Sequence, residues 1–153
     1  MLLDFDDIAL RVSAAALVGV LIGVNRDLQN KPIGARTLGL VGLGTATVAV
    51  SGIQFPGMAE NPDAASPVIQ GIIQGVMTGI SFVGAGVILR DAKTKIVEGL
   101  TTAATVWVTA ALGIACGFGA WRSIAVAVPV ALVLLVIVPW AENALSKDKR
   151  LLE

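Results

Sequence analysis

The chain has 153 residues, of which 56% are hydrophobic and only 14% are charged. A soluble domain usually carries about a quarter charged residues, so a water-soluble fold of this composition would expose large apolar patches. The 11 basic and 11 acidic residues cancel, which gives no case for nucleic-acid binding. Histidine is absent, and the single cysteine excludes an intramolecular disulfide. We see no nucleophile–base pair and no metal cluster, so we expect neither an enzyme nor a bound cofactor.

Five apolar segments are long enough to cross a bilayer as helices, which takes about 17–25 residues each. They cover residues 8–25, 37–53, 68–89, 99–119 and 123–141. We therefore predict an all-α membrane protein, a bundle of about five transmembrane helices that forms a single membrane domain over residues 1–153. Between the second and third helices, Gln54 to Pro67 reads as an irregular outer loop. We expect no soluble C-terminal domain.

The basic residues predict how the chain is oriented in the membrane. Nine of the 11 fall in the connection after the first helix, the connection after the third, or the C-terminal tail. Arg11 and Arg122 are the two on the other side, and Arg11 is close enough to the membrane edge to snorkel. Under the positive-inside rule the N-terminus is outside and the C-terminus is cytoplasmic.

A shift of 64 residues superimposes Arg26-Asp27 on Arg90-Asp91 and Thr45 on Thr109. The match predicts a duplicated helical hairpin plus one extra helix, an arrangement related to the parallel repeats of some transporters. The alternative is chance combined with the shared needs of two inward-facing turns.

Glycine rows predict close helix packing, because helices in lipid associate through small residues and interhelical hydrogen bonds. These rows are Gly19 and Gly23, then Gly71, Gly75 and Gly79, then Gly113 and Gly117. Polar stripes run beside two of the rows. Their members are Gln70, Gln74, Thr78 and Ser81 in the third helix, and Thr101, Thr102, Thr105 and Thr109 in the fourth.

Two interpretations of these stripes remain open. The amides and hydroxyls can bond to neighbouring helices, or to their own backbone, and merely hold the bundle together. Alternatively, they can line a narrow polar path or ligand pocket. No charged residue falls in the middle of a predicted helix, which argues against a pump coupled to ion flow.

The charged turns form a candidate functional cluster at the cytoplasmic face. Its members are Asn25, Arg26, Asp27, Lys31, Arg36, Arg90 and Asp91. The arginines can be topology anchors, but carboxylates gain nothing from anchoring. If the repeat brings Asp27 and Asp91 together, they are weak candidates for a Mg²⁺ site, since Mg²⁺ prefers oxygen ligands. The neighbouring arginines would compete for the same carboxylates.

At these residues the chain resembles the membrane domain of the MgtC/SapB family. The similar stretches are Gly19-Val-Leu-Ile-Gly-Val-Asn-Arg26, Lys31-Pro-Ile-Gly-Ala-Arg-Thr37, Ile80-Ser-Phe-Val-Gly-Ala-Gly-Val-Ile-Leu-Arg90, Glu98-Gly-Leu-Thr-Thr-Ala-Ala-Thr-Val-Trp107 and Ala111-Leu-Gly-Ile-Ala-Cys-Gly117. Within them the resemblance implies packing roles for Gly34, Phe82, Gly84, Gly86, Gly99 and Trp107. The chain departs from the family pattern at Asn25, where glutamate is common, and at Leu38, where histidine is frequent.

The resemblance implies a bacterial inner-membrane protein, linked to growth in low magnesium and, in pathogens, to survival inside host cells. We expect a regulatory or accessory role through contacts with the lipid bilayer and other membrane proteins, and a homo-oligomer. The alternative is a small transporter or channel for Mg²⁺ or another small solute.

Overall fold

The computed structural model describes the backbone of residues 3–54, 62–90 and 97–149, and the side chains of residues 3–54, 65–88 and 97–140. Its helices are α1 (Phe5–Leu28), α2 (Ala35–Ile53), α3 (Pro62–Ala85), α4 (Leu100–Gly117) and α5 (Trp121–Lys149). Between α3 and α4, β1 (Leu89–Arg90) pairs antiparallel with β2 (Val97–Glu98). Each of the five helices contains a segment long and apolar enough to span a bilayer. The predicted all-α membrane fold is confirmed.

The helix ends differ from the predicted ones for local reasons. α1 begins at Phe5, and Asp6 and Asp7 lie in its first turn, where carboxylates interact favourably with the positive end of the helix dipole. α3 begins at Pro62, so the prediction of an irregular loop as far as Pro67 is wrong. A proline suits a first helical position because its missing N–H would have no partner there. α5 continues past the apolar stretch to Lys149.

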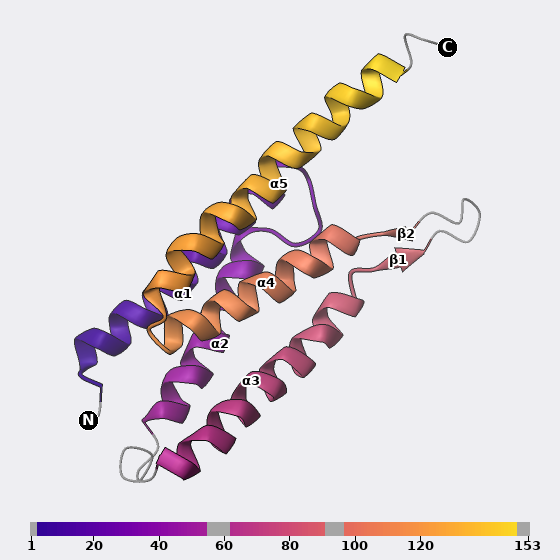
Figure 1. Cartoon of the computed structure of the whole chain (residues 1–153). Coiled ribbons are helices and arrows are strands. Elements are labelled where there is room, and N and C mark those ends of the chain that lie inside the picture. Colours follow the sequence, from indigo (N-terminus) through magenta and orange to yellow (C-terminus); the bar gives the residue numbers. More distant parts are fainter. Residues whose placement is uncertain (1–2, 55–61, 91–96, 150–153) are drawn as a thin grey trace.

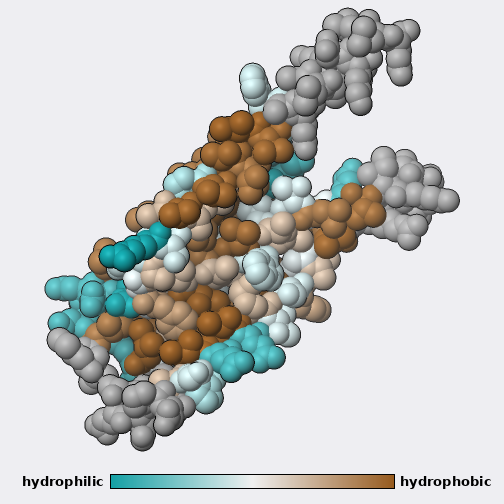
Figure 2. Space-filling view, viewed as in Figure 1, coloured by the Kyte–Doolittle hydropathy of each residue, from teal (hydrophilic) through white to brown (hydrophobic). Residues whose placement is uncertain are grey.

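The helices are not equally surrounded. In the apolar window of α4, 56% of the residues are buried, against 6% in α3 and 6% in α5. Figure 1 shows α3 along one edge of the bundle and α5 extending beyond it towards the C-terminus. In Figure 2 hydrophobic residues cover α5, whereas hydrophilic residues gather at the end with the N-terminus and in a separate patch over α3. The core therefore lies where α1, α2 and α4 meet.

Glycines allow these three helices to approach closely. A Cβ added at Gly19 would overlap the carbonyl oxygen of Leu38, and one at Gly42 would overlap that of Ala15. At Gly113 an added Cβ would lie 2.8 Å from the carbonyl oxygen of Gly42. Such close backbone approach maximises van der Waals contact where no hydrophobic effect drives association.

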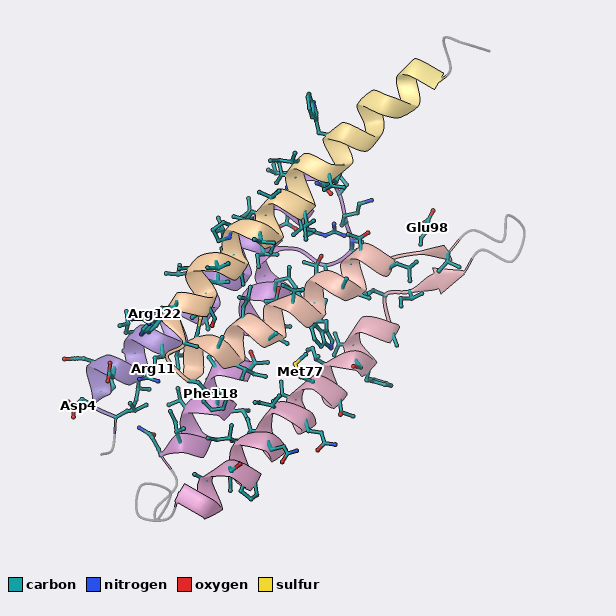
Figure 3. The ribbon with its side chains drawn as sticks, viewed as in Figure 1. Asp4, Arg11, Met77, Glu98, Phe118 and Arg122 are labelled. Atoms are coloured by element: carbon teal, nitrogen blue, oxygen red, sulfur yellow. The ribbon has the colours of Figure 1, made fainter. Side chains whose placement is uncertain are left out.

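At the end of the bundle that carries the N-terminus, Arg11 links two helices. Its Nη1 donates a hydrogen bond of 2.9 Å to the carbonyl oxygen of Gly117, at the C-terminus of α4. This carbonyl is one of the four that a helix leaves without an intrahelical partner. Figure 3 shows Arg11, Arg122 and Asp4 at this same end. Arg11 thus ties α1 to α4, and its snorkelling stays a prediction.

The opposite end carries the α1–α2 connection, β1 and β2, and the C-terminal end of α5 (Figure 1). These are the segments in which the sequence concentrates its lysines and arginines. We call this the basic end. Its cytoplasmic location, with the N-terminus outside, remains a prediction from the positive-inside rule.

Candidate functional site

The α1–α2 turn is held by Asp27. The backbone N–H of Ala35, at the start of α2, donates to Asp27 Oδ2 at 2.9 Å. A Cβ added at Gly34 would overlap the same carboxylate. A carboxylate at a helix N-terminus satisfies an otherwise unpartnered N–H and interacts favourably with the helix dipole. Asp27, in the last turn of α1, therefore caps the N-terminus of α2.

Arg26 lies inside the protein at the basic end. It is 2% exposed, and one guanidinium nitrogen, Nη2, donates to Thr102 Oγ1 on α4. Its Nε is buried with no hydrogen-bond partner among the described residues. A topology anchor would reach towards the headgroups and water. Arg26 instead joins α1 to α4 and keeps unused donor capacity.

Gln29 links α1 to α5. Its amide nitrogen donates to Asn25 Oδ1 and to the carbonyl oxygen of Leu135, both at 3.2 Å. The Leu135 carbonyl is free for a specific reason, since its acceptor role within α5 would fall to the N–H of residue 139, which is Pro139. A membrane helix tolerates an internal proline when a neighbour satisfies the freed carbonyl.

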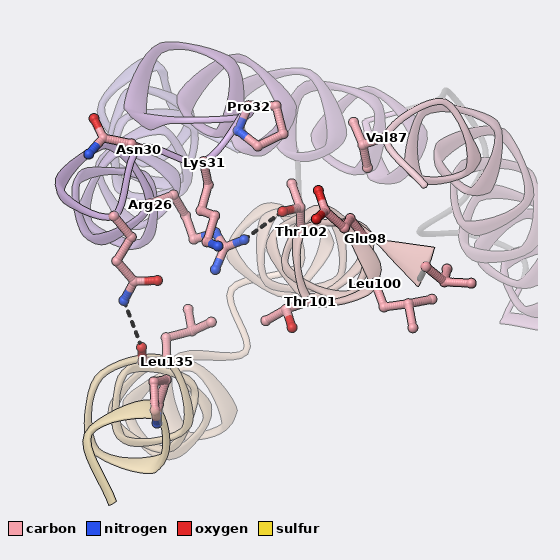
Figure 4. Close-up of a pocket in the computed structure, with 14 residues that line it drawn as sticks. Arg26, Asn30, Lys31, Pro32, Val87, Glu98, Leu100, Thr101, Thr102 and Leu135 are labelled. Atoms are coloured by element: carbon pink, nitrogen blue, oxygen red, sulfur yellow. Dashed lines mark hydrogen bonds between the residues drawn. The ribbon is translucent and has the colours of Figure 1, made fainter. Parts of the chain in front are cut away.

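Arg26, Gln29 and Thr102 line a cavity of about 620 Å³ between the ends of α1, α4 and α5. Both Arg26 and Lys31 line it, and in Figure 4 their side chains extend in the same direction, towards α4. The lining also includes Glu98, whose carboxylate lies beside Thr102 in that view. Because two cations and a carboxylate line this cavity, we take it as our candidate functional site.

The other members of the predicted cytoplasmic cluster whose side chains the structure describes do not line this cavity. Arg36 is exposed at the start of α2 and does not line it. Arg90 was expected to end the third helix, but α3 stops at Ala85 and Arg90 belongs to β1. Arg26, its repeat counterpart, lies within α1, so the two arginines are not structurally equivalent. Asp91 falls outside the described residues, and the origin of the repeat by duplication stays a prediction.

The hydroxyls of α4 bond mainly to their own helix. Thr105 Oγ1 donates to the carbonyl oxygen of Thr101 at 2.7 Å, and Thr109 Oγ1 to that of Thr105 at 2.9 Å. Thr45 on α2 bonds its own helix backbone in the same way. Within the part of the chain that the structure describes, Thr102 is the one member of the α4 stripe that accepts a bond from another helix, while Thr101 is exposed. The arrangement favours packing over a continuous polar path.

The polar stripe of α3 points away from the other helices. All four predicted members, Gln70, Gln74, Thr78 and Ser81, are exposed. Nothing described lies within 4 Å of a Cβ added at Gly71, Gly75 or Gly79. The expectation that this glycine row packs against a neighbouring helix of the chain is wrong. Spacing alone shows that a helix face is smooth but not that another helix lies on it.

The residues carried over from the family pattern have different environments. Gly99 has a φ of +87° and comes so close to the Val87 carbonyl that a Cβ would overlap it, so glycine is required there. Gly84 is buried against Ala103, whereas Gly86 is exposed. Two aromatic members face outward, with Phe82 84% exposed and Trp107 50% exposed. For Phe82 a packing role within this chain is wrong.

The described residues hold no group of three or more histidine, cysteine, aspartate or glutamate side chains that could bind a metal ion. Asp27, one of the two weak metal candidates, already accepts the Ala35 N–H. Sequence reasoning missed Gln29 and the Leu135 carbonyl, whose bond spans 106 positions. A signal was present in Pro139, which always frees the carbonyl four residues before it.

Five apolar helices with a glycine-packed centre define a multi-pass membrane protein. Within that class the chain belongs to the MgtC family, whose sequence model matches residues 12–144. The predicted family resemblance is confirmed. No solved structure is detectably similar to the chain.

Three curated relatives show how far the similarity extends. Protein SrpB of Synechococcus elongatus is 43% identical over 125 residues, which cover 78% of this chain and 68% of SrpB. Protein SapB of Bacillus subtilis is 31% identical over 94% of this chain and 61% of SapB. Protein MgtC of Salmonella typhimurium is 38% identical over 74% of this chain and 45% of MgtC. The chain thus matches about half to two thirds of the length of these relatives.

Proposed function

We propose that this chain is a bacterial inner-membrane protein with an accessory or regulatory role, which acts by contacting other membrane proteins through α3. The observation that carries the proposal is the outward face of α3, where a glycine row with open space beside it runs next to exposed amides and hydroxyls. Membership of the MgtC family supports a link to magnesium-limited growth or stress adaptation.

The position of the glutamines explains why this face needs a partner. At 1.5 Å per residue, Gln74 lies about 18 Å along the helix from Pro62, close to the middle of the apolar window Ala65–Ala85. An amide exposed to hydrocarbon has no water to bond, which costs free energy unless a protein group pairs with it. Gln70 and Gln74 also line a shallow groove with Ser66 and Ile69. A helix with small and polar residues fits such a face.

The alternative of a small transporter or channel has less support. The threonine hydroxyls of α4 are mostly engaged with their own helix, and the buried Arg26–Thr102 contact lies in the wall of the cavity at the basic end. Mg²⁺ flux into liposomes that contain only the purified protein would overturn the accessory role, above all if Asp27→Asn abolished that flux.

The direct test places a photo-cross-linking residue at position 74 in cells grown at limiting Mg²⁺. We expect a defined membrane-protein adduct that Gly75→Leu removes, and Gly75→Leu should also impair low-magnesium growth at unchanged protein level. Val133→Leu is the matched control, because Val133 is an exposed apolar residue on α5. Normal growth of the Gly75→Leu strain would refute the role of α3.

A second copy of the chain is another occupant of this face, since we also expect self-association. In that case the adduct at position 74 has twice the mass of the chain, and Gly75→Leu lowers the mass measured in mild detergents. A monomer in several mild detergents, without a self-adduct, would overturn the prediction of a homo-oligomer. The growth experiment would then decide whether α3 contacts a different membrane protein.

A further inference from the structure

The described lining of the cavity at the basic end holds two cations and one carboxylate, that of Glu98. Arg26 lies within it at 2% exposure, with Nε unbonded among the described residues. Among the described residues, its one side-chain hydrogen bond is to Thr102, which is uncharged. A buried guanidinium costs several kcal/mol of desolvation unless an anion pairs with it. Lys31 lines the same cavity and adds a second positive charge.

The charge balance of the lining points to a single negative charge. Arg26 and Lys31 contribute two positive charges and Glu98 one negative charge, and the remaining lining residues that the structure describes are uncharged. The described lining residues therefore carry a net charge of +1. A phosphodiester carries one negative charge and offers oxygen acceptors to guanidinium and ammonium donors.

An apolar cavity continues from this polar one. It measures about 320 Å³, lies between α4 and α5, and is lined almost wholly by aliphatic side chains such as Ala104, Val130 and Leu134. It shares Thr101 and Leu135 with the polar cavity. A cationic chamber at the membrane edge that continues into an apolar groove along two helices has the two-part chemistry of a lipid site.

We propose that this pair of cavities binds a phospholipid. The phosphate lies between Arg26 and Lys31, and one acyl chain lies in the groove between α4 and α5. The ligand supplies the anion that the buried guanidinium lacks, and it fills the gap beside α5, a helix that buries little of its own surface. The site is separate from the outward face of α3, so either proposal can fail without the other.

Native mass spectrometry of the purified protein, titrated with phosphatidylglycerol, tests the site. We expect one tightly bound lipid per chain. Lys31→Gln should weaken its binding about fivefold, since a lysine near an anionic headgroup contributes on the order of 1 kcal/mol. Arg36→Gln is the matched control, because Arg36 is exposed at the same end but lies outside the cavity. Equal weakening by both substitutions would mean general surface attraction and would overturn the site.

Two further ligands separate the phosphate from its lipid tail. Diacylglycerol with the same acyl chains should bind at least tenfold more weakly, and equal binding would refute the role of the cations. Ala104→Phe, which fills the groove, should weaken phosphatidylglycerol and leave inorganic phosphate unaffected. If inorganic phosphate bound as tightly as the lipid and Ala104→Phe changed neither, a free-phosphate site would replace the lipid proposal. Lys31 is exposed, so its substitution tests the cavity even if Arg26→Gln fails to fold.

Discussion

The α1–α2 hairpin and the α3–α4 hairpin share sequence matches at their turns but differ in how they use their small residues. In the first hairpin, Gly19 and Gly23 lie so close to α2 that an added Cβ would overlap backbone atoms. In the second, Gly71, Gly75 and Gly79 of α3 face open space, and only Gly84 packs closely on α4. The first hairpin is therefore completed within the chain, whereas α3 leaves a face for another molecule.

The turns of the two hairpins also differ, because the first is compact and the second is extended. The first is short and is tied by Asp27 to the N–H of Ala35. The second extends through β1 and β2 and ends at Gly99, whose positive φ turns the chain into α4. Two hairpins with matching residues at their turns thus differ in structure, since the first is compact and the second is open on its outer side. The comparison teaches that burial, rather than residue type, distinguishes a glycine that contacts a helix of the same chain from one that lies on a face open to another molecule.

The largest expected effect comes from a substitution in the packed core, where α4 of the second hairpin meets α2 of the first. Gly113→Leu forces a side chain into Thr45 and the backbone of Gly42. Overpacking costs about 1–3 kcal/mol even where side chains can yield, and here backbone must move, so we expect loss of folded, monodisperse protein. Gly75→Leu, on the open side, should change the free energy of unfolding by less than about 0.5 kcal/mol. Thermal unfolding in detergent measures both, and equal destabilisation would invalidate the contrast.

A smaller effect is expected at the first turn. Asp27→Ala removes the acceptor for the Ala35 N–H and should cost about 1 kcal/mol, the usual value of a lost helix cap. Asp27→Asn keeps a side-chain oxygen and should recover most of that loss. Denaturant titration checks the order of the three proteins. If Mg²⁺ stabilised the native chain but not the Asp27→Asn variant, Asp27 would be a metal ligand rather than a cap.

The features that could be predicted from the sequence are those that depend on residues close together in the chain. Apolar length predicted five helices, and the spacing of Gly113 and Gly117 predicted close approach, which α2 provides. Features that depend on distant partners were missed. Identical spacing at Gly71, Gly75 and Gly79 could not reveal that α3 lies at the edge. The match of Arg90 to Arg26 could not reveal that α3 ends at Ala85, before the Gly86-Val87 turn. The buried state of Arg26 depends on Thr102, 76 positions away.

The smallest expected effect concerns the attachment of α5 to the first hairpin. Gln29→Leu removes the bond to the Leu135 carbonyl and should cost roughly 0.6 kcal/mol, the average for a polar contact between membrane helices. Pro139→Ala restores an N–H that can bond the same carbonyl within α5. In that background Gln29→Leu should therefore cost less, and the double-mutant cycle should give a coupling of a few tenths of a kcal/mol.

Pro129→Ala provides the control for this cycle. Pro129 lies six residues before Leu135 in α5, about 9 Å along the helix axis, and the carbonyl it frees belongs to another turn. Its cycle with Gln29→Leu should give no coupling. Equal coupling at both prolines would show that the substitutions act through the general stiffness of α5. Coupling confined to Pro139 would establish that Gln29 satisfies the carbonyl which that proline leaves free, and that this bond holds α5 beside the basic end.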